Sequence, residues 1–134
     1  MLNILLAEDN WGDVLLVQEA LRAHQVQHTL HVVRDGAEAL AFVERMGQPG
    51  SEPCPDLVLL DVNLPKVDGP EVLRALRNHE ACARTPVIVV SSSDSPRDRT
   101  RMAELGIARY FKKPSDFEAF LKLGAVVGEV IEAA

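Results

Sequence analysis

The sequence predicts an α/β fold built on a five-stranded parallel sheet with helices on both faces. Short apolar runs rich in β-branched residues alternate with longer stretches in which apolar residues recur at the helical period. Three of these runs are almost unbroken, as expected of central strands that helices cover on both sides. The chain has 134 residues, of which 47% are hydrophobic and 25% charged, so it fits a single domain with a substantial core.

Five strands are expected, each followed by a helix. The strands are residues 2–7, 29–33, 57–60, 87–90 and 108–111. Four of the helices have recognisable start signals, which are Asn10, Pro70, Ser95 with Pro96, and a capping box over residues 115–118. The other helix, second in the chain, is expected around the apolar positions of residues 37–43. Asp13 falls in the first turn of the first helix, where a negative charge suits the helix dipole.

Residues 47–55 hold two glycines and three prolines and are expected to form a surface loop. A tolerated insertion is the favoured interpretation, and a partner-binding loop is the alternative. The only cysteines, Cys54 and Cys82, are 28 positions apart, with no Cys-x-x-Cys pair and no nearby histidine cluster. We therefore expect neither a disulfide framework nor a structural zinc site.

The acidic composition argues against several classes of partner. Fourteen Lys and Arg against twenty Asp and Glu give a formal charge of −6, which disfavours binding to nucleic acid or to anionic lipid. Glu8 and Asp9 interrupt the N-terminal apolar run before it reaches the length of a signal peptide, and no other run approaches the roughly 18 apolar residues of a membrane span. We expect a cytoplasmic protein with reduced cysteines and no membrane insertion.

Polar residues stand where the expected strands end. Glu8 and Asp9 follow the first strand, Asp61 the third, Ser91 the fourth and Lys113 the fifth. Ligands of doubly wound sheets bind beyond the carboxyl ends of the strands, so these side chains would converge on one pocket. Taken singly, each is equally well explained as a solvated strand end, a helix cap or part of a polar loop. Their joint placement at different strand ends favours a site.

The chemistry of this set points to phosphoryl transfer. Clustered carboxylates repel one another unless a cation compensates, which predicts a hard divalent metal such as Mg²⁺. Magnesium attracts phosphate, and Asp61 would act as a nucleophile toward phosphorus. Lys113 would neutralise charge on the transferring oxygens, and Ser91 would donate a hydrogen bond to one of them.

Four segments that carry these residues resemble, in order and spacing, the signature segments of the response-regulator receiver domain of two-component signalling. They are residues 4–10 (ILLAEDN), 57–69 (LVLLDVNLPKVDG), 86–91 (PVIVVS) and 110–114 (YFKKP). The resemblance covers essentially the whole chain. It implies a doubly wound, flavodoxin-like sheet with the strand order 2-1-3-4-5.

The resemblance also implies a role for each site residue. Asp61 would accept a phosphoryl group from a histidine of a sensor kinase. The ligands of Mg²⁺, with Mn²⁺ as an alternative, would be Glu8, Asp9, Asp61 and the backbone carbonyl of Asn63. Lys113 would pair with the phosphoryl group, and the bond between Lys113 and Pro114 would be cis.

Ser91 and Tyr110 correspond to the switch pair of this family. The hydroxyl moves toward the phosphoryl group and the aromatic ring follows inward. Ordinary aromatic packing at a sheet edge is the alternative for Tyr110. Asn63 and Ser93 lie two residues beyond Asp61 and Ser91, at positions that tune the lifetime of the phosphoryl group in the family.

Residues 1–134 are expected to form one receiver domain without an output domain, a signalling protein rather than an enzyme with a separate substrate. Its message would pass by protein contact or by phosphorelay, and a phosphate sink or a non-phosphorylated scaffold are the alternatives. Residues 10–16, the turn at residues 34–36 and the loop after Met46 resemble the small receivers that serve phytochrome-like histidine kinases.

Such receivers often self-associate through the fourth helix, fifth strand and fifth helix, so a homodimer through that face is expected. The core stripe of the last helix is expected to be Phe117, Phe120, Leu121, Gly124 and Val127. Further apolar residues are expected on another side, as an interface or as scattered surface residues, and these are Leu123, Val126 and Val130.

Two rival functions of similar architecture are disfavoured by particular residues. A flavin-binding module needs a hydroxyl- and glycine-rich phosphate loop after the first strand, where this chain has Glu8 and Asp9. A phosphohydrolase with an aspartyl-phosphate intermediate usually has a second acid two residues after its nucleophile, where this chain has Asn63.

Overall fold

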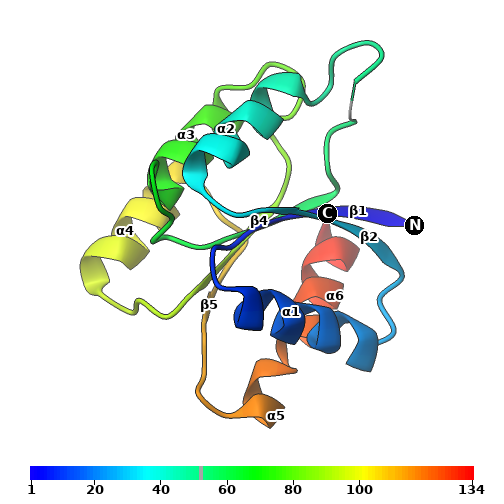
Figure 1. Ribbon diagram of the computed structural model, residues 1–134, viewed down its shortest axis with the longest axis vertical. Coiled ribbons are helices and arrows are strands. Elements are labelled where there is room, and N and C mark those ends of the chain that lie inside the picture. Colours follow the sequence, from blue (N-terminus) through cyan, green and yellow to red (C-terminus); the bar gives the residue numbers. More distant parts are fainter. Residues whose placement is uncertain (52) are drawn as a thin grey trace.

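The computed structural model describes residues 1–51 and 53–134, and its five parallel strands form one sheet in the order β2-β1-β3-β4-β5 (Figure 1). The strands are β1 (Leu2–Ala7), β2 (His28–Val33), β3 (Leu57–Leu60), β4 (Val87–Ser91) and β5 (Arg109–Lys112). The expected α/β fold and strand order are confirmed. The bounds of β2, β4 and β5 differ from the expected ones by one residue.

Helices cover both faces of the sheet (Figure 1). On one face lie α1 (Trp11–Ala23), α5 (Phe117–Phe120) and α6 (Leu123–Ala133). On the other face lie α2 (Gly36–Arg45), α3 (Gly69–Arg77) and α4 (Pro96–Leu105). Among the described residues, none of these helices combines the length and the apolar character needed to cross a membrane.

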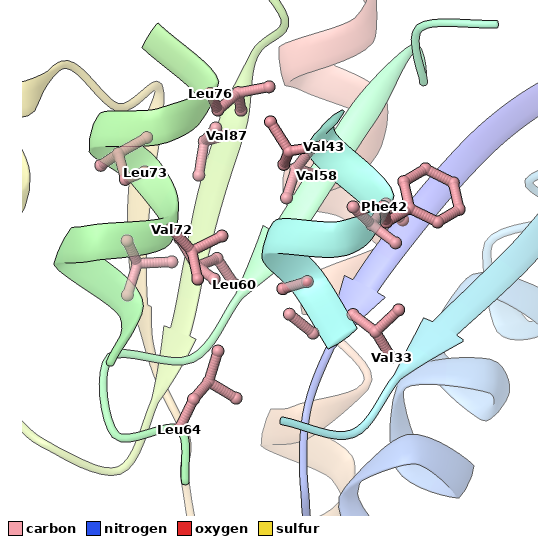
Figure 2. Packing of buried hydrophobic residues seen from close by; sticks show 14 of the residues in the cluster. Val33, Phe42, Val43, Val58, Leu60, Leu64, Val72, Leu73, Leu76 and Val87 are labelled. Carbon is pink, nitrogen blue, oxygen red and sulfur yellow. The ribbon is translucent and has the colours of Figure 1, made fainter. Parts of the chain in front are cut away.

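The sheet separates two hydrophobic clusters because side chains of a strand alternate between its faces. Toward α2, α3 and α4, the interior strands β3 and β4 present Val58, Leu60, Val87 and Val89. Figure 2 shows residues of this cluster meeting the apolar faces of α2 and α3. Toward α1 and α6, the same strands present Leu57, Leu59, Ile88 and Val90. Every residue of β3 and β4 is buried, which explains their unbroken apolar runs.

Polar side chains cap the helices near the expected positions. The side chain of Asn10 accepts a hydrogen bond from the Asp13 N–H at 3.0 Å, and such a cap is typically worth about 1 kcal/mol. At the start of α5 the cap is Asp116, which accepts from the Ala119 N–H at 3.0 Å. The expected capping box at Ser115 is therefore wrong, because Asp116 is the residue directly before the first helical turn.

The C-terminal segment forms two helices where one was expected. Across the two-residue turn between α5 and α6, Leu123, Val127 and Val130 follow the buried Phe120 at helical spacing, and all of them lie in the core. The expected surface stripe is therefore wrong for Leu123 and Val130, which are at most 7% exposed, and only Val126 is partly exposed.

Phe117, expected in the core, is the first residue of α5 and lies at the surface, where it is 49% exposed. Gly124 lies in the core stripe as expected and brings α6 close to α1. Any side chain at Gly124 would collide with the carbonyl oxygen of Ala20.

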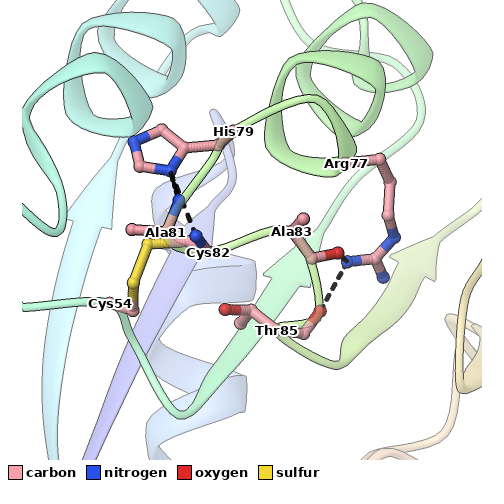
Figure 3. The surroundings of a disulfide bond; sticks show 7 residues. All are labelled: Cys54, Arg77, His79, Ala81, Cys82, Ala83 and Thr85. Carbon is pink, nitrogen blue, oxygen red and sulfur yellow. Dashed lines mark hydrogen bonds between the residues drawn. A yellow bond between two sulfur atoms is a disulfide. The ribbon is translucent and has the colours of Figure 1, made fainter.

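Cys54 and Cys82 form a disulfide, so the expectation of reduced, unpaired cysteines is wrong for this structure (Figure 3). Their Cα atoms are 5.6 Å apart although 28 positions separate them in sequence. Cys54 lies shortly before β3 and Cys82 shortly before β4, and the parallel pairing of these strands brings the two segments together. His79 Nδ1 accepts hydrogen bonds from the N–H groups of Ala81 and Cys82, both at 3.1 Å, and holds the turn that carries Cys82.

The loop expected over residues 47–55 is exposed at residues 47–51 and at Pro53, as predicted. Glu52 lies outside the described residues. Gly47 and Gly50 both have φ of 76°, a backbone conformation that favours glycine. Pro55 is buried at the end of the loop, and the disulfide at Cys54 ties the loop to the body of the domain.

Candidate functional site

The carboxyl edge of the sheet brings four of the predicted site residues together. Glu8 follows β1, Asp61 follows β3 and Lys113 follows β5. The Lys113 ammonium lies 2.7 Å from Glu8 Oε1 and 3.0 Å from Asp61 Oδ2. One carboxylate oxygen each of Glu8, Asp9 and Asp61 lies within 4.8 Å of the others. Three strands that are distant in sequence thus supply one compact cluster of opposite charges.

The backbone holds Asp61 from both sides. Its N–H donates to the carbonyl of Ala7 at 3.2 Å, which continues the pairing of β1 with β3. Its Oδ1 accepts from the Asn63 N–H at 3.1 Å. Gly69 begins α3 against this segment, donating its N–H to the carbonyl of Val62 at 2.8 Å. A side chain at Gly69 would collide with the carbonyl oxygen of Asp61, so only glycine permits this close approach.

Lys113 is held by both its backbone and its side chain. Its N–H donates to the carbonyl of Ser91 at 2.8 Å, and its side chain is 10% exposed. The peptide bond between Lys113 and Pro114 is trans, so the expected cis bond is wrong. Trans is the more stable isomer of such bonds by about 0.5–1 kcal/mol. With the trans bond in place, the ammonium of Lys113 still reaches the carboxylates.

A third carboxylate, that of Asp13, also contacts the ammonium of Lys113. Asp13 Oδ2 lies 2.8 Å from Lys113 Nζ. Sequence reasoning placed Asp13 in the first turn of α1 and missed this contact. The available signal was the position of the N-cap, since a helix that starts at Trp11 sets its first turn directly beside the acidic end of β1.

Burial and neighbouring charges shift the protonation of two of these groups. Burial raises the pKa of Glu8 to about 7, the charge of Asp61 adds to this rise, and the hydrogen bond and charge of Lys113 oppose it. Burial lowers the pKa of Lys113. The hydrogen bonds to Asp13 and Glu8 and the charge of Asp61 raise this pKa, and together they outweigh the effect of burial. The net result is a pKa of Lys113 above its usual value, so its ammonium is charged at neutral pH.

The donor set fits a hard divalent cation. Glu8, Asp9 and Asp61 offer carboxylate oxygens, which are the ligands that Mg²⁺ and Mn²⁺ prefer. Glu8 and Asp61 are buried, whereas Asp9 is exposed and opens one side of the cluster to solvent. The single ammonium of Lys113 leaves most of the negative charge for a cation to balance.

Ser91 and Tyr110 share one hydrogen-bonded network at the end of β4. The buried Ser91 Oγ accepts from the Ser93 N–H at 3.2 Å. The hydroxyl of Tyr110 donates to the carbonyl of Ser93 at 2.7 Å, and the guanidinium carbon of Arg99 lies 4.4 Å from the centre of the Tyr110 ring. Burial raises the pKa of Tyr110. The two residues are linked through Ser93, and their switch role stays a prediction.

Sequence comparison agrees with this geometry. A family model for the response regulator receiver domain matches residues 4–123. Response regulator Rcp1 of Synechocystis sp. is 38% identical over 120 residues, which cover 90% of this chain and 82% of Rcp1.

Solved structures of related proteins share the fold over nearly their full length. The Mn²⁺-bound form of Rcp1 is 35% identical with a TM-score of 0.87, covering 100% of this chain and 97% of that one. The phosphorylated cyanobacterial phytochrome response regulator RcpA is 36% identical with a TM-score of 0.86, covering 98% and 94%. The receiver domain of sensor histidine kinase PA1611 from Pseudomonas aeruginosa, with magnesium in its active-site cleft, is 27% identical with a TM-score of 0.77, covering 98% of each chain.

Proposed function

Since this chain belongs to the response regulator receiver domain family, we propose that it accepts a phosphoryl group from a sensor histidine kinase onto Asp61 in a Mg²⁺-dependent reaction. The position of the Asp61 carboxylate carries this proposal, because it lies 3.0 Å from the Lys113 ammonium and within 4.8 Å of oxygens of Glu8 and Asp9. A nucleophile, a cation for the transferring oxygens and a pair of metal ligands thus occupy one pocket.

The transfer itself needs little covalent chemistry from the protein. A carboxylate oxygen of Asp61 attacks the phosphorus of a phosphohistidine, so that a P–O bond forms while the P–N bond breaks and its electron pair returns to the donor imidazole, which takes up a proton. Lys113 exchanges its contact with Asp61 for a phosphoryl oxygen, and Ser91 donates to another.

A divalent cation would complete the charge balance of this pocket. Its ligands would be Glu8, Asp9, Asp61 and the backbone carbonyl of Asn63. Mg²⁺ or Mn²⁺ bound there supplies charge neutralisation and orientation for the transferring oxygens. The Mn²⁺ in Rcp1, the magnesium in the PA1611 receiver and the phosphorylated state of RcpA support the proposal by similarity.

Ser91 and Tyr110 would carry the signal from the pocket to the surface. When the Ser91 hydroxyl turns toward the phosphoryl group, it gives up its contact with the Ser93 N–H. Tyr110 is bonded to the carbonyl of the same residue, so the loop between β4 and α4 and the aromatic ring respond together. Asn63 and Ser93 flank the pocket as candidates for tuning the lifetime of the phosphoryl group.

Residues 1–134 would act as one receiver whose output is contact with another protein or phosphorelay, without catalysis on a separate substrate. Similarity to Rcp1 and to the phytochrome response regulator RcpA supports a phytochrome-like kinase as the donor. We place the reaction in the cytoplasm, where kinases draw on ATP. A phosphate sink remains the second candidate, since it uses the same pocket. The charge of −6 argues against nucleic acid as a partner.

A homodimer through α4, β5 and α6 is part of the proposal. β5 is an edge strand of the sheet, so its outer side is available to a second copy. Because Leu123 and Val130 are buried, the face would rely on exposed charged residues such as Arg109, which pairs with Glu129 at 2.6 Å. Arg109→Glu should lower the mass measured by light scattering from dimer to monomer, whereas Arg22→Glu on α1 should not. A dimer mass that Arg109→Glu leaves unchanged, or a monomeric native chain, would exclude this interface.

Intact-protein mass after incubation with acetyl phosphate and Mg²⁺ tests the phosphorylation itself. The native chain should gain one phosphoryl group, and Asp61→Asn should gain none. Asp56→Asn removes a carboxylate close to Asp61 in sequence but outside the pocket, so it should behave as the native chain. Chelation of the metal should prevent the gain. A folded native chain that gains nothing in the presence of Mg²⁺ would instead support a scaffold role.

A further inference from the structure

We propose that Asp13 is a positioning residue for phosphoryl transfer. It holds the Lys113 ammonium in place while Glu8 and Asp61, the other two partners of that ammonium, change their contacts. This inference rests on the proposed function and adds to it a residue of α1. Asp13 lies outside the four signature segments of the family, shortly after the first of them, residues 4–10.

The ammonium of Lys113 has three N–H donors, and three carboxylates surround it. The distances from Nζ are 2.7 Å to Glu8, 2.8 Å to Asp13 and 3.0 Å to Asp61. Among the described residues, the cluster that could hold a metal ion consists of Glu8, Asp9 and Asp61. Two of the three partners of Lys113 therefore belong to the metal cluster, and Asp13 is the partner that does not.

Asp13 is also the partner with a separate support. It lies in the first turn of α1, and its N–H donates to the N-cap side chain of Asn10 at 3.0 Å. Its side chain is 23% exposed, which makes it the most accessible of the three carboxylates. The carboxylate thus reaches Lys113 from the first turn of a helix, whereas Glu8 and Asp61 directly follow strand ends.

The steps of the reaction alter the contacts of Lys113 unequally. A bound cation would have oxygens of Glu8 and Asp61 among its ligands, and in the transfer one oxygen of Asp61 would enter the new P–O bond. Asp13 takes part in neither change and stays available to Lys113. Because the lysine stem is long and flexible, losing this partner leaves the ammonium less well placed for the phosphoryl oxygens.

A general electrostatic role of Asp13 would have the opposite effect. A carboxylate near the pocket repels an anionic phosphodonor, so its removal would speed phosphorylation if charge alone mattered. Positioning predicts slower phosphorylation, and the direction of the change therefore distinguishes the two.

The test measures the rate of phosphorylation by acetyl phosphate at saturating Mg²⁺. Asp13→Ala should react roughly tenfold more slowly, as expected for loss of a hydrogen bond between charged groups. Asp13→Asn should recover part of the loss, since its amide oxygen still accepts from Lys113. Glu19→Ala is the matched control, because Glu19 lies on the same helix and pairs with Arg22 instead. In a Lys113→Ala background, Asp13→Ala should cause no further loss, because Asp13 acts through Lys113.

A binding measurement complements the rate. Trp11 is the only tryptophan and opens α1 beside the pocket, so its fluorescence can follow the binding of beryllofluoride, a phosphoryl analogue, with Mg²⁺ present. Asp13→Ala should weaken this binding by a similar factor, with Asp13→Asn intermediate and Glu19→Ala unchanged.

Several outcomes would overturn the inference. One is an Asp13→Ala variant that is phosphorylated as fast as the native chain or faster. Another is an Asp13→Ala change that slows phosphorylation by the same factor in the Lys113→Ala background as in the native chain. Circular dichroism checks that each variant is folded, and if Asp13→Ala is not, a native rate for Asp13→Asn would overturn it as well. The proposed function is tested separately, by whether the native chain gains the mass of one phosphoryl group. A native chain that is phosphorylated at the same rate as Asp13→Ala refutes the role of Asp13 alone.

Discussion

The hydroxyl of Tyr110 donates a hydrogen bond to the carbonyl oxygen of Ser93 at 2.7 Å. The bond joins the edge strand β5 to the loop after β4, two residues beyond Ser91. Arg99 of α4 covers the ring on one face, and its guanidinium also bonds to Asp94 at 2.5 Å. One side chain thus connects a strand, a loop and a helix, so a shift of the loop changes the position of the ring.

Tyr110→Phe should lower the free energy of unfolding by about 0.5–1.5 kcal/mol, because the ring keeps its packing and only the bond to Ser93 is lost. Unfolding in urea measures the change. Hydrogen exchange of residues 92–95 should become faster in the variant, since the loop loses an anchor. A variant with native stability and native exchange would show that this bond contributes nothing.

Gly69→Ala should destabilise the protein by roughly 1–3 kcal/mol, because the new Cβ has no room beside the carbonyl of Asp61 and the backbone of Val62. Gly128→Ala is the matched control within α6, where a Cβ meets nothing within 4 Å. Alanine there should stabilise by up to about 1 kcal/mol through its higher helix propensity. Thermal unfolding of both variants checks the prediction, which fails if the two changes have the same sign.

Mg²⁺ should stabilise the protein more at pH 8 than at pH 6. The folded pKa of Glu8 is about 7, above its ordinary value of 4.5. Between these values the folded state keeps a proton that the unfolded state has lost, so the contribution of Glu8 to stability declines as the pH rises through this window. A divalent cation binds the ionised carboxylate and competes with that proton.

The measurement for Glu8 is the shift in Tm on adding Mg²⁺ at the two pH values. Glu8→Gln cannot ionise, so it should reduce the difference between the shifts. Glu80→Gln, a change at an exposed site, should retain it. An equal Mg²⁺ effect at both pH values in the native chain would contradict the assignment.

Reduction of the disulfide between Cys54 and Cys82 should lower the free energy of unfolding by about 3–4 kcal/mol. The bond restricts the unfolded chain by closing a long loop, and its loss restores that freedom. Urea unfolding with and without dithiothreitol gives the difference. Cys54→Ser should unfold, with and without dithiothreitol, at the urea concentration that unfolds the reduced native chain. A native chain whose urea unfolding is the same with and without dithiothreitol would count against the bond.

Much of the fold follows from the sequence because local signals agree with the global arrangement. The runs in β3 and β4 are buried on both faces and hence continuous, and caps such as Asn10 mark helix starts directly. The site was predictable for a topological reason. Parallel strands end at one edge, so Glu8, Asp61 and Lys113 had to meet there once their strands were recognised.

The remaining features depend on contacts through space. The contact of Asp13 with Lys113 spans 100 positions, and the disulfide depends on where two loops enter neighbouring strands. The break between α5 and α6 has no glycine or proline to announce it, and the burial of Leu123 beside Phe120 depends on how this segment packs in the domain. Periodicity alone does not decide which side of such an apolar helix faces the core.

The bond between Cys54 and Cys82 also makes residues 54–82 a covalent ring, and this ring contains β3, Asp61 and all of α3. A protease that cuts one peptide bond inside the ring leaves the two fragments joined. Electrophoresis without reductant would then show a nicked protein at its original size. Peptide mapping of a modification on Asp61 would accordingly require reduction first. In a tryptic digest of the oxidised protein, the peptide that holds Cys54 and Asp61 would stay bonded to the peptide that holds Cys82.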